Sequence, residues 1–479
     1  MIHYCRLAAA CALLVPAMFA GCAGLDPWNT MDRTPNAPSV PYQADADPVR
    51  DARAFTSEVL IPPEALSGEL TLAECIRAAL ESNPRTRGAW SAARAAAARV
   101  GEQKAAFLPQ ANILGGVRRS DVPTSRNNQP ETIYNAGVEL SYLLYDGGAR
   151  AAQVSKAEAE LIAANYLHTA AIHELAMRVR EAYYDLLAAH SLLEVAQETD
   201  RQTHKHVELA QARHETGLVA RSDVLKAQTR QADAALGLVR AQSNQKVARG
   251  KLASAMNLEL TAPFEVAPAS EEAAVEIARL GDLLDTAALM RPELQAALAQ
   301  VGARRSELQA ANAGYRPDIS ITTAYGVRED SFAPQDEEWS VGAVLSLPLF
   351  TGFERSYRVR GAQANLKSSV FEYEKALQEV SLEVWTTYQR TVEARQAIDA
   401  ATALVESARE SLDVAEGEYK NGIGSIIDLI DAQTAYTHAR NQLVQARLDR
   451  HTALARLERA VGQSLAWQSG RAMEEGEQP

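Results

Sequence analysis

Aromatic residues and cysteines are scarce in this 479-residue sequence, and basic residues are outnumbered by acidic ones. Only 6% of the residues are aromatic, while Ala, Glu, Gln, Arg and Leu are abundant, a mixture that suits long helices with narrow apolar stripes. The 48 Lys and Arg residues against 61 Asp and Glu give a formal charge of −13, which argues against a nucleic-acid-binding protein, because such proteins present a basic face. The sequence also lacks a phosphate-binding loop, a nucleophile elbow and a paired-cysteine motif. We therefore expect no enzyme, no catalytic residues and no bound cofactor or metal.

The cysteines leave no pair for a disulfide bond in the mature chain. The apolar run from Leu7 to Phe19 is too short to span a bilayer and is typical of a secretory signal peptide, which we place at residues 1–21. The small residues before Cys22 resemble a lipobox and predict a lipid anchor at Cys22. Phe19 stands where a lipobox usually has Leu, so cleavage without lipidation stays open as an alternative. Cys75, in a helical pattern, is expected to be a small buried side chain.

One stretch of the sequence occurs twice. Glu418–Thr434 has the sequence EYKNGIGSIIDLIDAQT, and Arg213–Thr229 has the related sequence RHETGLVARSDVLKAQT. Gly217 and Gly422 interrupt long helical patterns at equivalent positions, and Ser425 can cap the helix that follows the second break. Two copies of one helical hairpin tip predict a chain built from two structural halves.

Each half also contains a pair of segments in which side chains alternate with a period of two, although the alternation is weak in the first of them, Gln110–Arg119. From Ile133 to Tyr145, Val138 points to an apolar face and Glu139 to the opposite face. In the second half, Ile319–Val327 and Trp339–Leu347 alternate in the same way. Strands of about this length cross a membrane when they are tilted, and an apolar face opposite a small or polar one is typical of a membrane barrel. The edge of an ordinary β-sandwich is the alternative, but it does not explain the very long flanking helices.

Four strands cannot close a membrane barrel, because the smallest common barrels have about eight strands. An open sheet edge in hydrocarbon leaves backbone groups unpaired at a cost of several kcal/mol each. Other copies of the chain must therefore complete the barrel, and a cyclic trimer is the simplest closure. The predicted fold class is mostly α with a transmembrane β portion. We expect a trimeric 12-stranded β-barrel with four strands per chain, continued by a long α-helical coiled-coil tunnel, with a two-fold internal structural repeat.

These patterns divide the sequence into ten predicted segments. They are the signal peptide (1–21), an extended N-terminal arm (22–69), the helices of repeat 1 (70–108), transmembrane hairpin 1 (109–146), long helical hairpin 1 (147–256), an equatorial segment (257–291), the helix of repeat 2 (292–316), transmembrane hairpin 2 (317–351), long helical hairpin 2 (352–462) and a disordered tail (463–479).

The order and spacing of several short motifs, taken together, resemble the TolC-like outer-membrane efflux proteins. The motifs are Leu70-Thr71-Leu72, Asn83-Pro84, Leu108-Pro109, Tyr145-Asp146-Gly147-Gly148 and the tip sequence from Tyr419. No single motif is specific, and the likeness covers about Leu70 to Val461. The predicted lipid at Cys22 makes the chain most similar to the lipoprotein branch that serves tripartite pumps of the RND type.

This resemblance implies partners and a location. The implied partners are two further copies of the chain in a homotrimer, a periplasmic membrane-fusion adaptor, an inner-membrane transporter (the RND type is favoured) and outer-membrane lipid. The implied location is the cell outer membrane, with a lipid anchor and a helical tunnel that extends into the periplasm.

Acidic side chains at the second tip are the candidate functional residues. Asp428 and Asp431 are three positions apart, on one face of the first turns of a helix. In a trimer, each acid would form a ring of carboxylates that favours cations and binds divalent ions. The resemblance places the periplasmic aperture at these positions. The alternative is that Asp428 caps the helix and Asp431 is simply solvated.

The remaining tip residues are expected to hold the tip closed or to contact partners. Arg221 and Asp223, with Tyr419 on the second tip, are the predicted gate links, and Gly217 and Gly422 are the predicted adaptor-contact points. Nearby histidines at 204, 206 and 214 are expected to be ordinary surface residues, because positions 204 and 206 face different sides of a helix.

The predicted function is a passive outer-membrane exit duct for small molecules such as drugs, toxic compounds or metal ions. A type I protein secretion duct is the alternative within the same class. A non-conducting periplasmic coiled-coil tether is the alternative in another class, although a tether has no use for four strands of membrane length.

Overall fold

The computed structural model describes residues 69–120, 131–268, 278–329 and 337–463. The chain divides into two units, residues 1–60 and 61–479, and every described residue belongs to the second unit. The signal peptide, the lipid-anchor position Cys22, the arm up to residue 68 and the tail from residue 464 lie outside the described residues.

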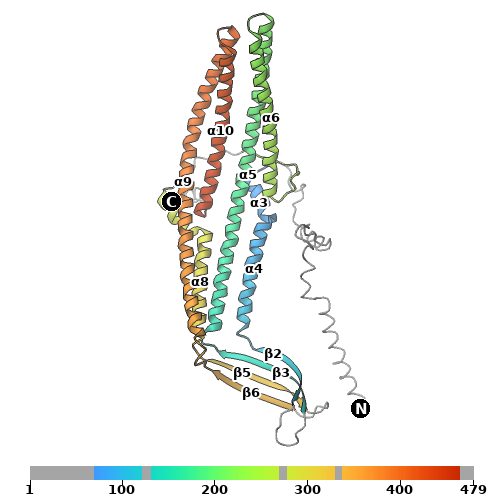
Figure 1. Cartoon of the computed structure of the whole chain (residues 1–479), viewed down its shortest axis with the longest axis vertical. Helices are drawn as coiled ribbons and strands as arrows, with labels where there is room; N and C mark the ends of the chain where they lie inside the picture. The colour runs from blue at the N-terminus through green and yellow to red at the C-terminus, as the bar shows by residue number, and fades with distance from the viewer. Residues whose placement is uncertain (1–68, 121–130, 269–277, 330–336, 464–479) are drawn as a thin grey trace, which may run out of the picture. The chain divides into compact units, whose positions relative to one another are not determined.

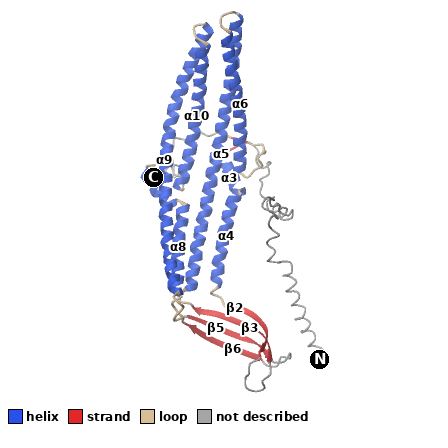
Figure 2. Ribbon diagram, in the orientation of Figure 1, coloured by secondary structure: helices blue, strands red, loops and turns tan. Residues whose placement is uncertain are grey.

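Helices dominate the described chain, and the element types follow one another in the same order in each half (Figures 1 and 2). Among the described residues the helices are α3 (Leu72–Ser82), α4 (Pro84–Ala105), α5 (Ala149–Glu215), α6 (Arg221–Ala255), α7 (Leu280–Met290), α8 (Pro292–Ala313), α9 (Glu354–Asn421) and α10 (Ile426–Val461). The strands are β1 (Glu69–Leu70), β2 (Gln110–Ser120), β3 (Glu131–Tyr145), β4 (Glu265–Val266), β5 (Asp318–Glu329) and β6 (Glu337–Ser346).

The two long helices confirm the predicted helical scaffold. Helix α5 has 67 residues and α9 has 68, so each is about 100 Å long at ~1.5 Å per residue. Each returns as a second helix, α6 or α10, after a glycine in the left-handed conformation, which is Gly217 (φ 75°) or Gly422 (φ 80°). Helices α4, α5, α8 and α9 pack in that order, and α10 packs on both α9 and α5. No helix in the described part of the chain is both long enough and apolar enough to span a membrane.

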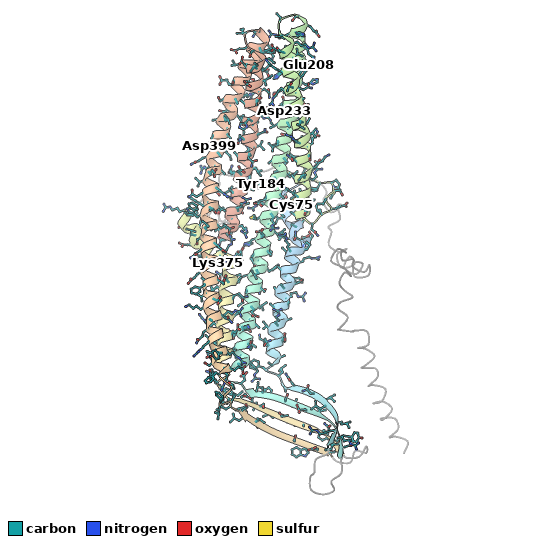
Figure 3. The ribbon with its side chains drawn as sticks, viewed as in Figure 1. Cys75, Tyr184, Glu208, Asp233, Lys375 and Asp399 are labelled. Carbon is teal, nitrogen blue, oxygen red and sulfur yellow. The ribbon has the colours of Figure 1, made fainter. Side chains whose placement is uncertain are left out.

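Two clusters of buried side chains surround the ends of the short helices. In the first, α3 packs against α5, α6 and the segment that follows α6, and Cys75 is fully buried there, as predicted (Figure 3). In the second, α7 packs with α8, α9 and α10 around Leu294, Val384 and Leu457, all of them fully buried. Thr71 caps α3: its side chain accepts a hydrogen bond from the Glu74 N–H, and the two residues form a capping box.

The four predicted long strands form one antiparallel sheet in the order β2-β3-β5-β6. The register places Val138 opposite both Ile113 and Tyr325, and Tyr325 opposite Trp339, so these four side chains share one face. Their exposed fractions are 49%, 87%, 56% and 73%, and the sheet's main contacts are between its own strands. A single chain therefore presents a broad apolar sheet face and two open edge strands. Closure into a barrel, trimerisation and the internal repeat stay predictions.

Candidate functional site

The candidate site is formed by the two helical turns at the end of the helices that lies away from the sheet (Figure 1). In the α5–α6 turn, the Leu218 N–H donates to the Arg213 carbonyl at 2.9 Å. In the α9–α10 turn, the Ile423 and Gly424 N–H groups both donate to the Glu418 carbonyl, at 2.9 and 3.1 Å. These bonds occupy carbonyls at the ends of α5 and α9 that no helical N–H can reach.

A small hydrophobic core joins the four helices behind these turns. Tyr419 is its largest member and is 1% exposed, and Leu429 is 0% exposed. The buried members come from all four helices: Val207, Ala210, Val224, Ala227, Leu412, Tyr419, Ile426, Leu429 and Ala432. Within one chain the two tips are therefore packed against each other, and opening them would expose this core to water.

Arg213 makes the main polar contact between the two tips. It lies in the last turn of α5, and its guanidinium donates a hydrogen bond to the Tyr419 carbonyl in the last turn of α9. The guanidinium carbon also lies 4.9 Å from the centre of the Tyr419 ring, within cation–π range. A positive charge here is favourable because the last turn of a helix carries partial negative charge. Sequence reasoning did not single out this residue.

Several polar atoms in the same core have no hydrogen-bond partner in the described chain. They are the Tyr419 hydroxyl, the Gln433 Oε1 atom and the Arg213 Nε atom. Burial raises the pKa of Tyr419 above its usual value, while nearby Arg213 acts in the opposite direction. A buried polar group without a partner costs about 1–3 kcal/mol, so the packed tip is less stable than its apolar contacts alone would make it.

The predicted aperture residues occupy the start of α10. Ser425 is the N-cap, as predicted, and its hydroxyl donates to the Asp428 Oδ2 atom at 2.7 Å within a capping box. These hydrogen bonds from Ser425 hold the pKa of Asp428 below its usual value and so favour its ionised form. Asp431 is exposed one turn later, and no described side chain pairs with it. A capping role for Asp428 is thus visible in one chain, and the aperture role stays a prediction.

The predicted gate links are only partly brought together. Tyr419 lies in the tip core, as described above. Asp223 is half-buried in the first turn of α6, and its ion pair is with Lys226 of the same helix at 3.5 Å. Arg221 is exposed at the first position of α6. Links between copies of the chain therefore stay a prediction.

The expectation of a surface histidine is wrong for His206. This side chain is 8% exposed, and its Nε2 atom lies 3.6 Å from the Glu416 carboxylate of α9. Burial lowers the pKa of His206 below its usual value, although Glu416 opposes the change. His204, in contrast, is exposed, beside Gln231 and Glu208. No cluster of potential metal ligands occurs among the described residues.

Comparison with known proteins identifies a family with this architecture. The family model for outer membrane efflux proteins matches residues 75–258 and 283–463. The chain belongs to this family. Its members are outer-membrane channels and not enzymes, which confirms the resemblance noted in the sequence and the expectation that the chain catalyses no reaction.

Individual relatives are distant but match over long stretches. The outer membrane protein TolC of Vibrio cholerae is 26% identical over 412 residues, which is 82% of this chain and 90% of that protein. The alkaline protease secretion protein AprF of Pseudomonas aeruginosa is 28% identical over 302 residues, which is 59% of this chain and 60% of that protein. The crystal structure of the Campylobacter jejuni CmeC outer membrane channel matches with a TM-score of 0.74 at 18% identity. It covers 85% of this chain and 89% of that chain, and it supports the fold.

Proposed function

We propose that the protein is a trimeric exit duct of the outer membrane that conducts substrate passively from an inner-membrane transporter and a periplasmic adaptor. Three copies of the four-stranded sheet close a 12-stranded barrel in the membrane, and the long helices form the tunnel that leads to it. Lipidation of Cys22 would tether the start of each chain to the same membrane.

The sheet is the observation that carries this proposal. Its alternating apolar side chains gather on one exposed face, where Trp339 and Val341 are 73% and 64% exposed. A broad apolar face exposed to water would promote aggregation, whereas the same face is compatible with lipid hydrocarbon. The two open edges, β2 and β6, require strands from other copies, because no water reaches the bilayer core to satisfy their backbone groups.

The tip is the candidate gate of the duct. In a trimer with α10 facing the axis, Asp428 and Asp431 form two rings of carboxylates one turn apart. The hydrogen bonds from Ser425 lower the pKa of Asp428 and so favour its ionised form, which supports a charged ring. Rings of this kind favour cations and bind divalent ions that block the pore.

Two substrate classes fit the same duct. The family name specifies efflux, which agrees with the small-molecule substrates predicted from the sequence. The name of AprF specifies secretion of a protease, and this favours a secreted protein as the second candidate substrate. The two candidates share the barrel, the tunnel and the gate, and they differ in the inner-membrane partner.

Single-channel conductance in planar bilayers tests the duct and its gate together. We expect the unaltered protein to give small, cation-selective currents that divalent ions block. A variant with both Asp428→Ala and Asp431→Ala should give larger currents, weaker cation selectivity and no divalent block. Ser425→Ala is the matched control, because it weakens the start of α10 by about 1 kcal/mol but keeps both carboxylates.

The outcomes separate the alternatives. If Ser425→Ala reproduces the effect of the double variant, the start of α10 controls conduction and the carboxylate rings do not. If neither the protein nor its variants conduct, and chemical crosslinking captures no trimer, the tethering alternative replaces the duct.

A further inference from the structure

A cavity of about 860 Å³ lies where α5, α8 and α9 meet the sheet (Figure 1). Its volume is typical of sites that hold small molecules. Charged side chains of these helices and of the turns beside them line the cavity, four of them basic and four acidic: Lys156, Arg316, Arg355, Arg358, Asp146, Glu307, Asp318 and Glu354. A passive tunnel and a gate at the far tip do not account for a charged cavity at this end of the helices.

Three of the four acids already have basic partners. The Glu307 Oε2 atom has two, because it lies 2.7 Å from the Arg304 Nη1 atom and 3.6 Å from the Lys156 Nζ atom. The other two pairs are Arg150 with Asp146, at 3.1 Å, and Arg358 with Glu354. Six basic groups therefore surround four acidic ones, and the cavity has an excess of two positive charges in each chain.

Arg316 and Arg355 pair with no carboxylate among the described residues, and neutral groups hold them in place. The Arg316 Nη1 atom donates to the Gly147 carbonyl at 2.7 Å. The Arg355 Nη1 atom donates to the Gly314 carbonyl at 3.3 Å, and its Nε atom donates to the Thr351 hydroxyl at 3.2 Å. A guanidinium group has five N–H donors, so each of these side chains has donors left for a ligand.

Two guanidinium groups held in this way favour an anion. Their planar arrangement of donors matches the oxygens of a carboxylate or phosphate group. Because backbone carbonyls already fix both side chains, binding costs little side-chain entropy. Arg355 bonds to Gly314, two positions before Arg316, and both arginines line the same cavity, so one ligand with several acidic groups can contact both.

The strand register places the cavity on the polar face of the sheet. Asp318 lines the cavity at the start of β5 and pairs with Ser346, whereas the next residue, Ile319, pairs with Leu345. Ile319 is six positions before Tyr325 and so lies on the apolar face with it, because alternate residues of a strand share a face. Asp318 therefore lies on the opposite face, which in the proposed duct encloses the water-filled interior.

We propose that this cavity binds small organic anions that carry carboxylate or phosphate groups, inside the duct where the tunnel meets the barrel. Arg316 and Arg355 are the main contacts. The position inside the duct rests on the proposed function, whereas the binding itself does not. The cavity would hold an anion that has passed the acidic tip at the opposite end of the tunnel, shortly before it leaves the duct.

Isothermal titration calorimetry with citrate, which carries three carboxylates, tests the binding on the full-length protein in phosphatidylcholine nanodiscs. Arg355→Gln removes one guanidinium group from the cavity. Arg360→Gln is the matched control, because Arg360 is five positions later in the same helix and is not among the residues that line the cavity. Gln153→Glu adds a carboxylate to the cavity wall with almost no change in side-chain size.

We expect the unaltered protein to bind citrate with an affinity that falls as the salt concentration rises. Arg355→Gln and Gln153→Glu should each weaken binding about tenfold, which corresponds to the loss of one charge-assisted hydrogen bond, and Arg360→Gln should leave the affinity unchanged. Gln153→Glu removes no side-chain contact of Arg316 or Arg355, so weaker binding in this variant reports the charge of the cavity and not its folding. Absence of citrate binding to the unaltered protein, or equal affinity in all three variants, would overturn the site.

Single-channel recording then tests the position of the cavity. Citrate added on the barrel side should reduce the current through the unaltered protein and through Arg360→Gln, and its effect on Arg355→Gln should be several-fold weaker. Citrate that binds but leaves the current unchanged would place the cavity outside the interior and overturn its role in the duct. A protein that conducts no current would refute the duct, while calorimetry would still decide whether the cavity binds anions, so the two failures are distinguishable.

Discussion

Replacing Arg213 with methionine should open the tip. Methionine keeps most of the aliphatic stem that packs between α5 and α9, but it removes the guanidinium that bonds to the Tyr419 carbonyl and lies over the Tyr419 ring. The change therefore affects the contact between the two hairpins and leaves the backbone hydrogen bonds of both helices in place.

The size of the effect follows from three contributions. A hydrogen bond from a charged donor contributes about 1.5–3 kcal/mol, and a partly exposed cation–π contact contributes about 0.5–1 kcal/mol. Against these, the variant also removes the buried Nε atom of Arg213, which has no partner in the described chain, and this recovers about 1–3 kcal/mol. Taken at their central values these contributions leave a net loss of about 1 kcal/mol, which would multiply the ratio of open to packed tips about fivefold.

Single-channel recording measures this ratio as the fraction of time spent in a high-conductance state. Arg213→Lys is the control, because it keeps the positive charge near the end of α9 but loses the planar group, and it should give an intermediate open fraction. Tyr419→Phe should act in the opposite direction, because it removes a buried hydroxyl that has no partner in the described chain. An open fraction unchanged by Arg213→Met would refute the claim that this contact holds the tip. More opening in Tyr419→Phe would show that the hydroxyl finds a partner in the assembled protein.

Two further predictions concern charged groups elsewhere in the helices. The lowered pKa of His206 means that the packed tip binds its proton less readily than an open tip, so packing is favoured above the usual pKa of 6.5 and weakens as the pH falls below it. The open fraction should therefore rise on acidification, and His206→Gln should abolish the rise; an unchanged pH response in His206→Gln would show that another group is responsible. Arg291 is 3% exposed and bonds to Glu293 and Glu383 at 2.8 and 2.7 Å, so Arg291→Met should lower helix stability by about 3 kcal/mol in thermal unfolding followed by circular dichroism. An unchanged unfolding midpoint would show that the network contributes little.

Local patterns in the sequence were enough to predict most of the scaffold. A long run without proline predicts a long helix, and the glycines at 217 and 422 mark the helix ends because only glycine adopts the left-handed conformation without strain. Alternation predicts the four strands for the same local reason. The Ser425 cap with Asp428 three residues later is also a local signal, and both its parts are present.

The pairings between helices could not be predicted, because in an alanine-rich helix the buried face is poorly marked. His206 lies three residues after Thr203 and four before Ala210, both buried, and this spacing was the available signal that it faces the core. Arg213 continues the same stripe three residues later, where its side chain reaches α9. Which helix that stripe meets depends on tertiary packing between segments about 200 residues apart, and a sequence period carries no information about that partner.

The distribution of polar contacts explains why motion should be confined to the tip. Midway along the helices, the donors of Arg291 reach two glutamates and the Arg459 carbonyl, so this region is tied together by charged hydrogen bonds between α8, α9 and α10. At the tip, the Tyr419 hydroxyl and the Gln433 Oε1 atom have no hydrogen-bond partner in the described chain. Separating the tips breaks the Arg213–Tyr419 and His206–Glu416 contacts and uncovers a small core, whereas separating the helices lower down breaks a network of several charged groups. On the proposed function, we therefore expect the duct to open at the tip while the rest of the helices stay packed.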